Sequence, residues 1–233
     1  MNEPQLPPLF KPERVSGRAD PFERACALAV AGSDPGTVVY NIENETLRAA
    51  IIFAPESPLE DAMTALPACG VGFQNALGSL APPEVAVHLE WGGAIRVNGA
   101  RCAAMNAAAS TCEPETEPDW LTVGLEITIR APDDIPFEDV NYTALFEEGC
   151  AEVEPVQLLE AWVRHTLYWI NRWTDDGVAP LHSEWRGLAF GLGEDVVIGG
   201  KSGTFLGIDE KFGALVRDDE TTHLISLTQV LEK

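Results

Sequence analysis

Apolar residues recur at intervals of three and four in three stretches of the chain, which is the spacing of a helix with one buried face. The stretches are 22–30, 59–80 (interrupted by Pro67 and Gly70) and 156–174. The last has the broadest apolar stripe. The pattern therefore predicts three helices, the longest in the second half of the chain.

Apolar runs typical of strands lie between these helices. Residues 37–40 and 49–53 are short and apolar, 85–91 carries a further strand, and 120–129 alternates between apolar and polar residues. The pair Asn98-Gly99 favours a tight hairpin turn, because both turn residues adopt positive φ. Helices and strands in this order predict an α+β fold in which helices pack on a mixed sheet.

The pattern changes after Trp185. Residues 196–198, 203–208, 213–216 and 223–227 are short apolar runs separated by Gly and Asp turns. Short strands at such spacing predict a small β-barrel. We therefore expect two domains, an α+β domain over 1–187 and a barrel over 190–233.

The charge balance of the chain argues against one class of binding partner. Among 233 residues, Lys and Arg number 15 and Asp and Glu 37, for a formal net charge of −22. Phosphate binding needs clustered cations, so we predict no nucleic-acid partner. No run approaches the roughly 20 apolar residues of a membrane span, and the first residues lack a signal-peptide pattern. Five cysteines without tight spacing indicate reduced thiols, so we expect a cytoplasmic protein without membrane contact.

Four motifs follow one another in an order typical of one protein family. Trp91 follows a strand where the family has Lys-Trp-Pro-Asn-Asp, and 98–104 stands at the place of a hairpin Gly-x-Lys-x-x-Gly. Residues 123–127 are similar to its Val-x-Gly-x-Gly-x-Asn strand, and 203–215 to its Gly-x-x-x-Gly-Ile-Asp-x-x-Gly-x-Leu segment. The chain thus resembles the biotin/lipoate protein ligases. The resemblance implies a ligase-like catalytic-type domain followed by an SH3-like barrel.

The resemblance also implies that an acid is joined to ATP and that its acyl group then passes to an acceptor lysine. The phosphates of that reaction need positive charge placed in advance. The family's Gly-Arg-Gly-Arg-x-Gly loop is replaced here by the acidic run 40–45, its motif lysine by Glu90 and its hairpin lysine by Arg101. Carboxylates beside a polyphosphate oppose its binding. We therefore expect ATP and Mg²⁺ as cofactors only if ligase activity is retained.

The expected site is a cleft for a small carboxylate with an apolar tail, of the biotin, lipoyl or octanoyl type. The residues assigned to it are Trp91, Gly92, Gly93, Arg101, Ala103, Ala104 and Gly124, with Arg48 as a second cation. Arg101 is the candidate catalytic residue, since a guanidinium binds a carboxylate through two hydrogen bonds. Ala103 and Ala104 leave room for the tail. Trp91 is equally compatible with core packing, and the glycine pair with a turn.

Three further side chains are candidates for catalysis or metal binding, but for each of them we favour a structural role. We expect Glu90 to pair with Arg96 or Arg101 rather than to act as a base. Cys150 stands among three glutamates, which raise a thiol pKa, so an idle thiol is favoured over an acyl-carrying one. His88 shares a strand face with Glu90 but has no third ligand nearby, so no metal site is predicted.

Three hypotheses about function follow. The first is a binding or acyl-transfer relative of the ligases that has lost their phosphate loop. The second is an active biotin or lipoate ligase that uses Arg48 and Arg101 as its cations. The third is a catalytically silent module with a filled cleft that binds a protein partner. Acceptor domains in these families are themselves acidic, and repulsion between acidic proteins slows their association, which argues against the second.

Overall fold

The computed structural model describes residues 3–131 and 141–232. Its larger sheet has seven strands in the order β1-β2-β3-β7-β6-β5-β4. These strands are β1 (Lys11–Arg14), β2 (Thr37–Ile42), β3 (Thr46–Phe53), β4 (Val87–Leu89), β5 (Ala94–Val97), β6 (Ala100–Ala109) and β7 (Leu121–Thr128). Only the β1–β2 pair is parallel among the described strands. The sheet is therefore mixed, as predicted.

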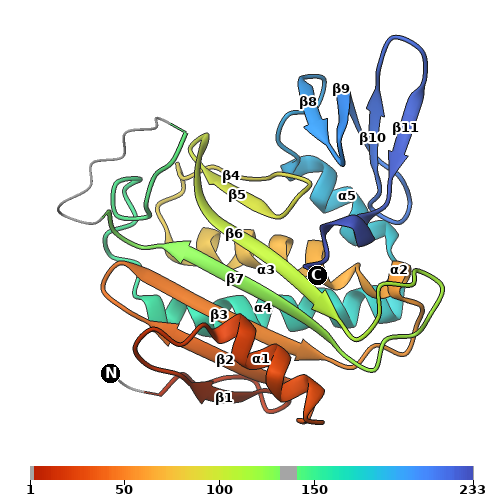
Figure 1. Ribbon diagram of the computed structural model, residues 1–233. Coiled ribbons are helices and arrows are strands. Elements are labelled where there is room, and N and C mark those ends of the chain that lie inside the picture. The colour runs from red at the N-terminus through yellow and green to blue at the C-terminus, as the bar shows by residue number, and fades with distance from the viewer. Residues whose placement is uncertain (1–2, 132–140, 233) are drawn as a thin grey trace.

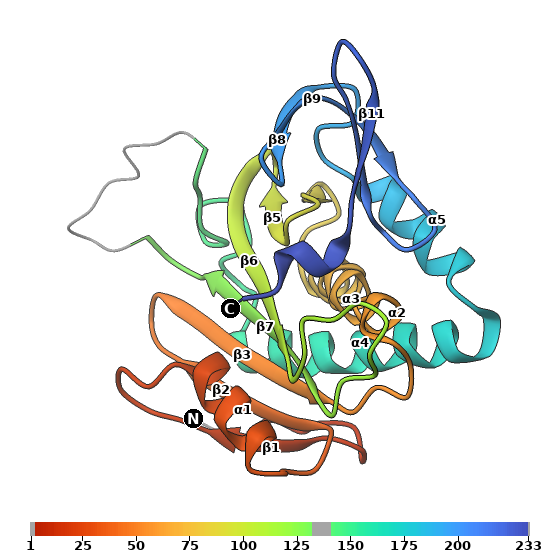
Figure 2. The ribbon, with the colours of Figure 1, turned by 45° about the vertical axis from the view of Figure 1, so that its right-hand side comes forward.

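Helices cover both faces of this sheet (Figure 1). Helices α3 (Ala65–Leu80) and α4 (Pro155–Asp176) lie on one face, and α1 (Pro21–Val30) lies on the other. Helix α1 packs over β2, β3 and β7, and Figure 2 shows that it does not extend over the far side of the sheet toward β5. The short helices α2 (Leu59–Ala62) and α5 (Ala179–Leu188) complete the set in the described chain. One part of the α1 face thus stays uncovered by helices.

The helical periodicity located three helices correctly, but one predicted detail was wrong. The helix expected over 59–80 breaks at Met63 and Thr64 instead of at Pro67 and Gly70. Pro67 lies in the first turn of α3, where its missing N–H removes no helical hydrogen bond. At Gly70 an added Cβ would lie 2.9 Å from Met105 Cε. The glycine thus lets α3 approach the sheet closely.

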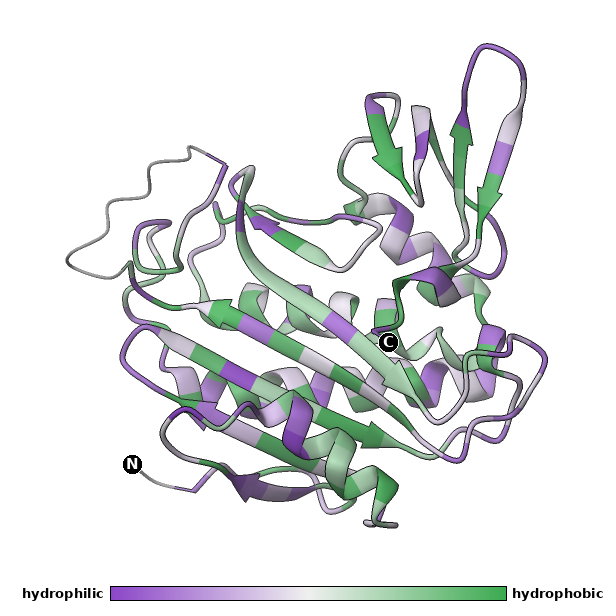
Figure 3. Cartoon of the chain, in the orientation of Figure 1, coloured by the Kyte–Doolittle hydropathy of each residue, from purple (hydrophilic) through white to green (hydrophobic). Residues whose placement is uncertain are grey.

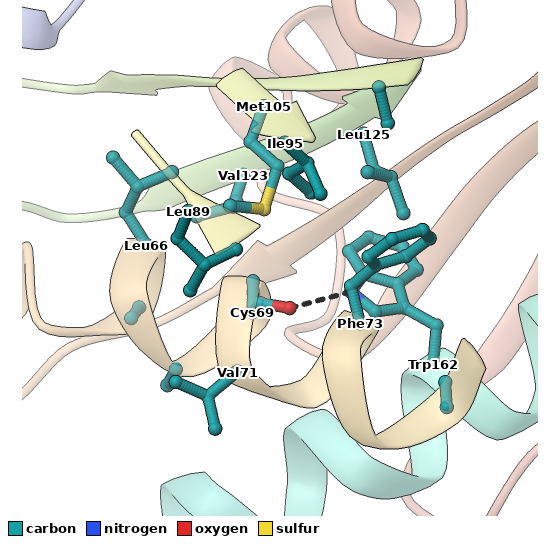
Figure 4. Packing of buried hydrophobic residues seen from close by; sticks show 14 of the residues in the cluster. Leu66, Cys69, Val71, Phe73, Leu89, Ile95, Met105, Val123, Leu125 and Trp162 are labelled. Atoms are coloured by element: carbon teal, nitrogen blue, oxygen red, sulfur yellow. Dashed lines mark hydrogen bonds between the residues drawn. The ribbon is translucent and has the colours of Figure 1, made fainter. Parts of the chain in front are cut away.

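Helix α3 is buried between the sheet and α4. Figure 4 shows Phe73 of α3 beside Trp162 of α4, with Val71 on the side of α3 that faces α4 and side chains of the sheet such as Met105 on the other. Trp162 is fully buried and its Nε1 donates a 3.1 Å hydrogen bond to the carbonyl oxygen of Cys69. Burying an indole is favourable only if its N–H finds an acceptor. This contact therefore fixes the two helices against each other.

The sheet shows the alternation expected of strands with two different faces. Leu47, Ala49 and Ile51 of β3 belong to the core beneath α3 and α4, whereas Ala50 and Ile52 pack against α1. Figure 3 shows hydrophobic and hydrophilic residues following one another along β7. The period of two therefore decides which residues reach the face with the open area.

Two elements were not predicted from the sequence patterns. Strand β1 has the sequence Lys-Pro-Glu-Arg, which is polar and contains a proline. Such a segment is tolerated at a sheet edge, where one side of the backbone needs no partner. Helix α5 is only ten residues long, which is too short for a clear apolar stripe.

The second sheet is open, so the predicted closed barrel was wrong. Its strands are β8 (Asp195–Ile198), β9 (Lys201–Ile208), β10 (Ala214–Arg217) and β11 (Thr222–Ile225), all antiparallel in the order β11-β10-β9-β8. Its buried residues, Phe205 and Val216 among them, join the same core as the larger sheet. The sheet buries its apolar face against the first 187 residues, so it need not close on itself.

The chain leaves β11 through the short 3-10 helix η1 (Leu227–Val230) and returns to the larger sheet. In the described part of the chain, no helix combines the length and the apolar character needed to cross a membrane. The proposed division at residues 187–190 overlaps the last two residues of α5 and lies ahead of β8.

Candidate functional site

The Gly92-Gly93 pair forms the tight turn between β4 and β5. Gly93 N–H donates to the carbonyl oxygen of Glu90 at 3.1 Å, and Glu90 N–H donates to that of Ala94 at 2.8 Å. Gly93 has φ +96°, and an added Cβ there would lie 2.5 Å from Met105 O. Positive φ and close approach to β6 both require glycine at position 93. This pair therefore shapes the hairpin, the alternative that the sequence left open.

Trp91 joins the two sheets. Its side chain is 8% exposed, and its Nε1 donates a 2.6 Å hydrogen bond to the carbonyl oxygen of Phe212. The cavity beside it measures about 20 Å³ and is enclosed by residues such as Leu66, Met105 and Trp185. A space of this size holds about one water molecule. On this side Trp91 is therefore packed against the protein, whereas on its hairpin side it borders an open groove.

Arg101 and Arg96 share one carboxylate, that of Glu90. Arg101 Nε donates to Glu90 Oε1 at 2.8 Å and Arg96 Nε to the same oxygen at 2.6 Å, while Arg101 Nη2 contacts Oε2. Burial alone raises the pKa of Glu90, but the hydrogen bonds from Arg101 and Arg96 hold the pKa below its usual value. The hydrogen bond to Glu90 likewise raises the pKa of Arg101.

The ion pair predicted across the hairpin is thus confirmed, and Glu90 engages both arginines. Arg96 also lies over the ring of Phe190, with Cζ 4.2 Å from its centroid. The side chain of Arg101 is 40% exposed and borders an open groove of about 470 Å³ between the hairpin and β8. Because Nε and Nη2 of Arg101 already bind Glu90, an incoming anion would have to compete with this carboxylate.

A second open cavity of about 280 Å³ lies on the face of the larger sheet that carries α1. Three of its side chains form one row across neighbouring strands, since Arg48 pairs in register with Glu126, and Glu126 with Ala104. The other lining residues are Asp20, Phe22, Ala49, Met105, Asn106, Leu125 and Glu232. We call this space the outer-face cavity. It is large enough for a small organic acid.

Arg48 is the cation of this cavity. Its side chain is 22% exposed, and its Nη2 lies 3.9 Å from Glu43 Oε2. Its Nε is buried and has no hydrogen-bond partner among residues 3–131 and 141–232. A buried N–H without an acceptor is costly, and such a group in a native structure calls for an explanation. A ligand oxygen would supply the missing acceptor.

The predicted site residues do not converge on one cleft. Trp91, Gly92 and Arg101 border the groove at the hairpin, whereas Arg48 and Ala104 line the outer-face cavity. Ala103 belongs to the core on the opposite face. Neighbours along a strand point to opposite faces, so Ala103 and Ala104 cannot line one cleft as expected.

Gly124 lies beside the outer-face cavity. A Cβ at this position would meet Asn106 Oδ1 at 2.1 Å and Phe22 Cδ2 at 2.7 Å. The glycine thus admits those two side chains to the sheet surface. Sequence reasoning missed Asn106 and Glu126, although the alternation places them on the same face as Ala104 and Gly124.

The turn between β2 and β3 contains only residues 43–45, and Glu43 N–H donates to Thr46 O at 2.9 Å. Its sequence is Glu-Asn-Glu. Backbone N–H groups that converge on phosphates are typical of longer glycine-rich loops. The two strands simply continue into each other through a short acidic hairpin.

The structure also shows the surroundings of Cys150 and His88, the two other side chains considered for chemistry. Cys150 is buried, and burial followed by the negative charge of Glu148 raises the pKa of its thiol, in line with an idle thiol. His88 is half-buried and its ring contacts Phe190 edge-on. No group of three or more His, Cys, Asp or Glu side chains in the described ranges is arranged to hold a metal ion.

Comparison with known proteins defines the class. Residues 6–187 match the biotin/lipoate A/B protein ligase family, and residues 192–233 match a family described as a domain of unknown function. The first match covers well over half of the chain. The chain therefore belongs to the biotin/lipoate A/B protein ligase family.

Particular relatives come from solved structures. The chain is 55% identical to a biotin protein ligase-like protein of unknown function from a Silicibacter species, with a TM-score of 0.95 over 99% of this chain and 100% of that one. It also resembles the biotin protein ligase of Aquifex aeolicus, at 19% identity and a TM-score of 0.75 over 93% of this chain and 95% of that one. The same enzyme in complex with biotin and ATP gives 17% identity and a TM-score of 0.73 over 92% and 95%.

The Aquifex likeness concerns the fold. A comparison with curated proteins gives no match.

Proposed function

We propose that this protein binds a small carboxylate with an apolar tail in the outer-face cavity and that Arg48 is the partner of the carboxylate. The observation that carries the proposal is that Arg48 lines the cavity and that its buried Nε has no acceptor in the described chain. Charge-assisted hydrogen bonds from arginine to carboxylate are among the stronger polar contacts in proteins. Phe22 and Ala104 supply apolar side chains to the lining, where a tail could lie.

This proposal moves the carboxylate partner from Arg101 to Arg48. Arg101 already donates two hydrogen bonds to Glu90, so a ligand would have to compete with an existing bidentate pair. Arg48 has only the distant carboxylate of Glu43 as an ion-pair partner in the described residues. We therefore choose Arg48 as the binding residue because its Nε lacks an acceptor in the described residues, although the family resemblance places a cation at Arg101.

We further propose that the protein does not perform ATP-dependent ligation. Glu43 and Glu45 occupy the short turn where the family resemblance places its phosphate loop, and Glu90 offsets one of the two positive charges of the hairpin arginines. At an effective dielectric constant near 20, two like charges about 8 Å apart repel by roughly 2 kcal/mol. A polyphosphate near this turn would meet such repulsion without a compensating lysine. The residues present therefore do not fit ATP and its Mg²⁺ ion.

The proposal is tested by isothermal titration of the purified protein with biotin, lipoate and octanoate, and with their adenylates. We expect at least one free acid to bind, Arg48→Gln to abolish or strongly weaken that binding, and Arg101→Gln to leave it nearly unchanged. ATP–pyrophosphate exchange with any of these acids should be absent. Exchange that depends on one of the acids would instead establish an active ligase that uses arginines.

A second candidate function is a catalytically silent module that binds a protein partner. The tight packing on the inner side of Trp91 favours it, because this hypothesis expects a closed cleft. The second sheet also exposes apolar side chains, those of Val197, Leu206 and Leu224. If none of the acids binds the wild-type protein or any variant, this candidate replaces the first.

A further inference from the structure

The outer-face cavity contains more negative charge than a carboxylate ligand would tolerate. Asp20, Glu126 and Glu232 line it together with the single cation Arg48. Asp20 has a structural task, since its side chain accepts from the N–H groups of Phe22 and Glu23 and caps α1. Glu126 is fixed on the sheet in register with Arg48. Glu232 differs from both because it arrives from the far end of the second sheet.

Glu232 belongs to a short segment, residues 227–232, which we call the strap. The strap follows β11 and returns to the middle of the larger sheet, as Figures 1 and 2 show. Leu231 forms an isolated parallel bridge with Ala107. Glu232 N–H donates to Ala107 O at 2.9 Å, and Asn106 Nδ2 donates to Glu232 Oε1 at 2.8 Å. The glutamate carboxylate is thus held at the cavity by a side-chain amide.

The strap has a place to bind because β6 is longer than its neighbour β5. Strand β5 pairs with β6 only as far as Ala104, whereas β7 pairs with β6 as far as Ala109 on the other side. One edge of β6 near Ala107 is therefore left without a strand partner. A free strand edge accepts an extended segment through backbone hydrogen bonds.

We propose that Glu232 competes with the carboxylate of the ligand for Asn106 and that the strap leaves β6 when the ligand binds. This inference rests on the proposed function. The carboxylate of Glu232 already accepts from Asn106 at the wall of the cavity that contains Arg48. A ligand carboxylate drawn to Arg48 would meet Glu232 as a like charge. Once the strap has left, Asn106 becomes a second donor to the ligand.

The strap makes few contacts with β6, so it can leave this strand and return to it. Two hydrogen bonds and the half-buried Leu231 hold its outer part, and the side chain of Glu232 is exposed. Leu227 is buried in the core at the other end of the strap and keeps it attached to the second sheet. Release therefore needs movement only beyond Leu227. If the strap is closed about nine times in ten, it weakens the apparent affinity for a ligand about tenfold.

The experiment compares Glu232→Gln with Glu220→Gln by titration with octanoate, lipoate and biotin. Both substitutions remove one negative charge, but Glu220 is an exposed residue of the β10–β11 turn and does not line the cavity. We expect Glu232→Gln to bind about tenfold more tightly than wild type and Glu220→Gln to bind as wild type does. Amide hydrogen exchange supplies a second readout, because saturating ligand should speed exchange of the Glu232 N–H.

The possible results separate the two proposals. Equal binding by wild type and Glu232→Gln, combined with a loss in Arg48→Gln, overturns the strap proposal and leaves the proposed function standing. Weaker binding by Glu232→Gln also overturns it, since Glu232 would then assist the ligand. Binding by Glu232→Gln alone supports both proposals. If no acid binds any variant, the proposed function fails and the strap proposal fails with it.

Discussion

The hairpin and the outer-face cavity each place an arginine near open space. Arg101 of the hairpin has a close carboxylate partner, whereas Arg48 of the cavity does not. At the hairpin, Arg101 and Arg96 share the carboxylate of Glu90, and every contact is short. In the cavity, Arg48 has a buried Nε with no acceptor in the described residues and an ion pair of 3.9 Å. The hairpin thus illustrates a charge used for structure, and the cavity a charge still available to a ligand.

This difference matters because the hairpin is where the family resemblance places the chemistry. A substitution of lysine by glutamate at position 90 would be unfavourable next to a phosphate. Next to two guanidinium groups it is favourable. The same residue therefore stabilises the hairpin and, under the proposed function, opposes phosphate binding, and substitutions in the hairpin and in the cavity test this comparison.

The largest effect is expected from Trp91→Ala. The substitution removes a buried indole between the sheets and its hydrogen bond to Phe212 O, so the free energy of unfolding should fall by about 3–5 kcal/mol. Urea denaturation measures it. The control Trp91→Phe keeps an aromatic ring and should lose only about 1–2 kcal/mol. A small effect of Trp91→Ala would mean that Trp91 does not join the sheets.

Glu90→Gln should have the second largest effect on the free energy of unfolding. It leaves Arg96 and Arg101 without a counter-charge, and we expect a loss of about 2–3 kcal/mol, below the full cost of breaking a buried pair because solvent screens the more exposed Arg101. Equilibrium unfolding in urea provides the measurement. Restored binding of ATP in this variant would show that the carboxylate alone had excluded phosphate.

Arg48→Gln should affect binding more than folding. Loss of a charge-assisted hydrogen bond should weaken binding of the acid by about 10- to 100-fold, which corresponds to roughly 1.5–3 kcal/mol. The unfolding free energy should change little, because the guanidinium makes few favourable contacts in the folded protein. A large loss of stability without a change in affinity would place Arg48 in the structure rather than in the site.

The smallest effect is a dependence on pH. The folded-state pKa of Glu90 lies below its ordinary value of 4.5, so its contribution is present above that value and is lost as pH falls through the folded pKa. The difference in unfolding free energy between wild type and Glu90→Gln should therefore shrink below about pH 4.5. Unfolding curves at several pH values check this. A difference that stays constant down to strongly acidic pH would contradict the ion pair.

The sequence predicted regular elements well where a single period decided them. Helices α1 and α4 and strand β7 lie close to their expected ranges, because one face of each is buried against one partner. Strand β1 and helix α5 were missed, since an edge strand and a short helix show little periodicity. Of the site, the Glu90 pair was predicted, because its partners lie on the same hairpin, only 6 and 11 residues away.

By itself, the sequence determined the membership in the ligase family, the acidic charge and the mixed sheet with its helices, because these depend on local periods and short motifs. Only the tertiary structure decided that the second sheet stays open, that Trp91 packs between the two sheets and that Arg48, Asn106 and Glu232 share one cavity. These residues come from distant parts of the chain. Strand order and the choice of face brought them together, and neither can be read from neighbouring residues.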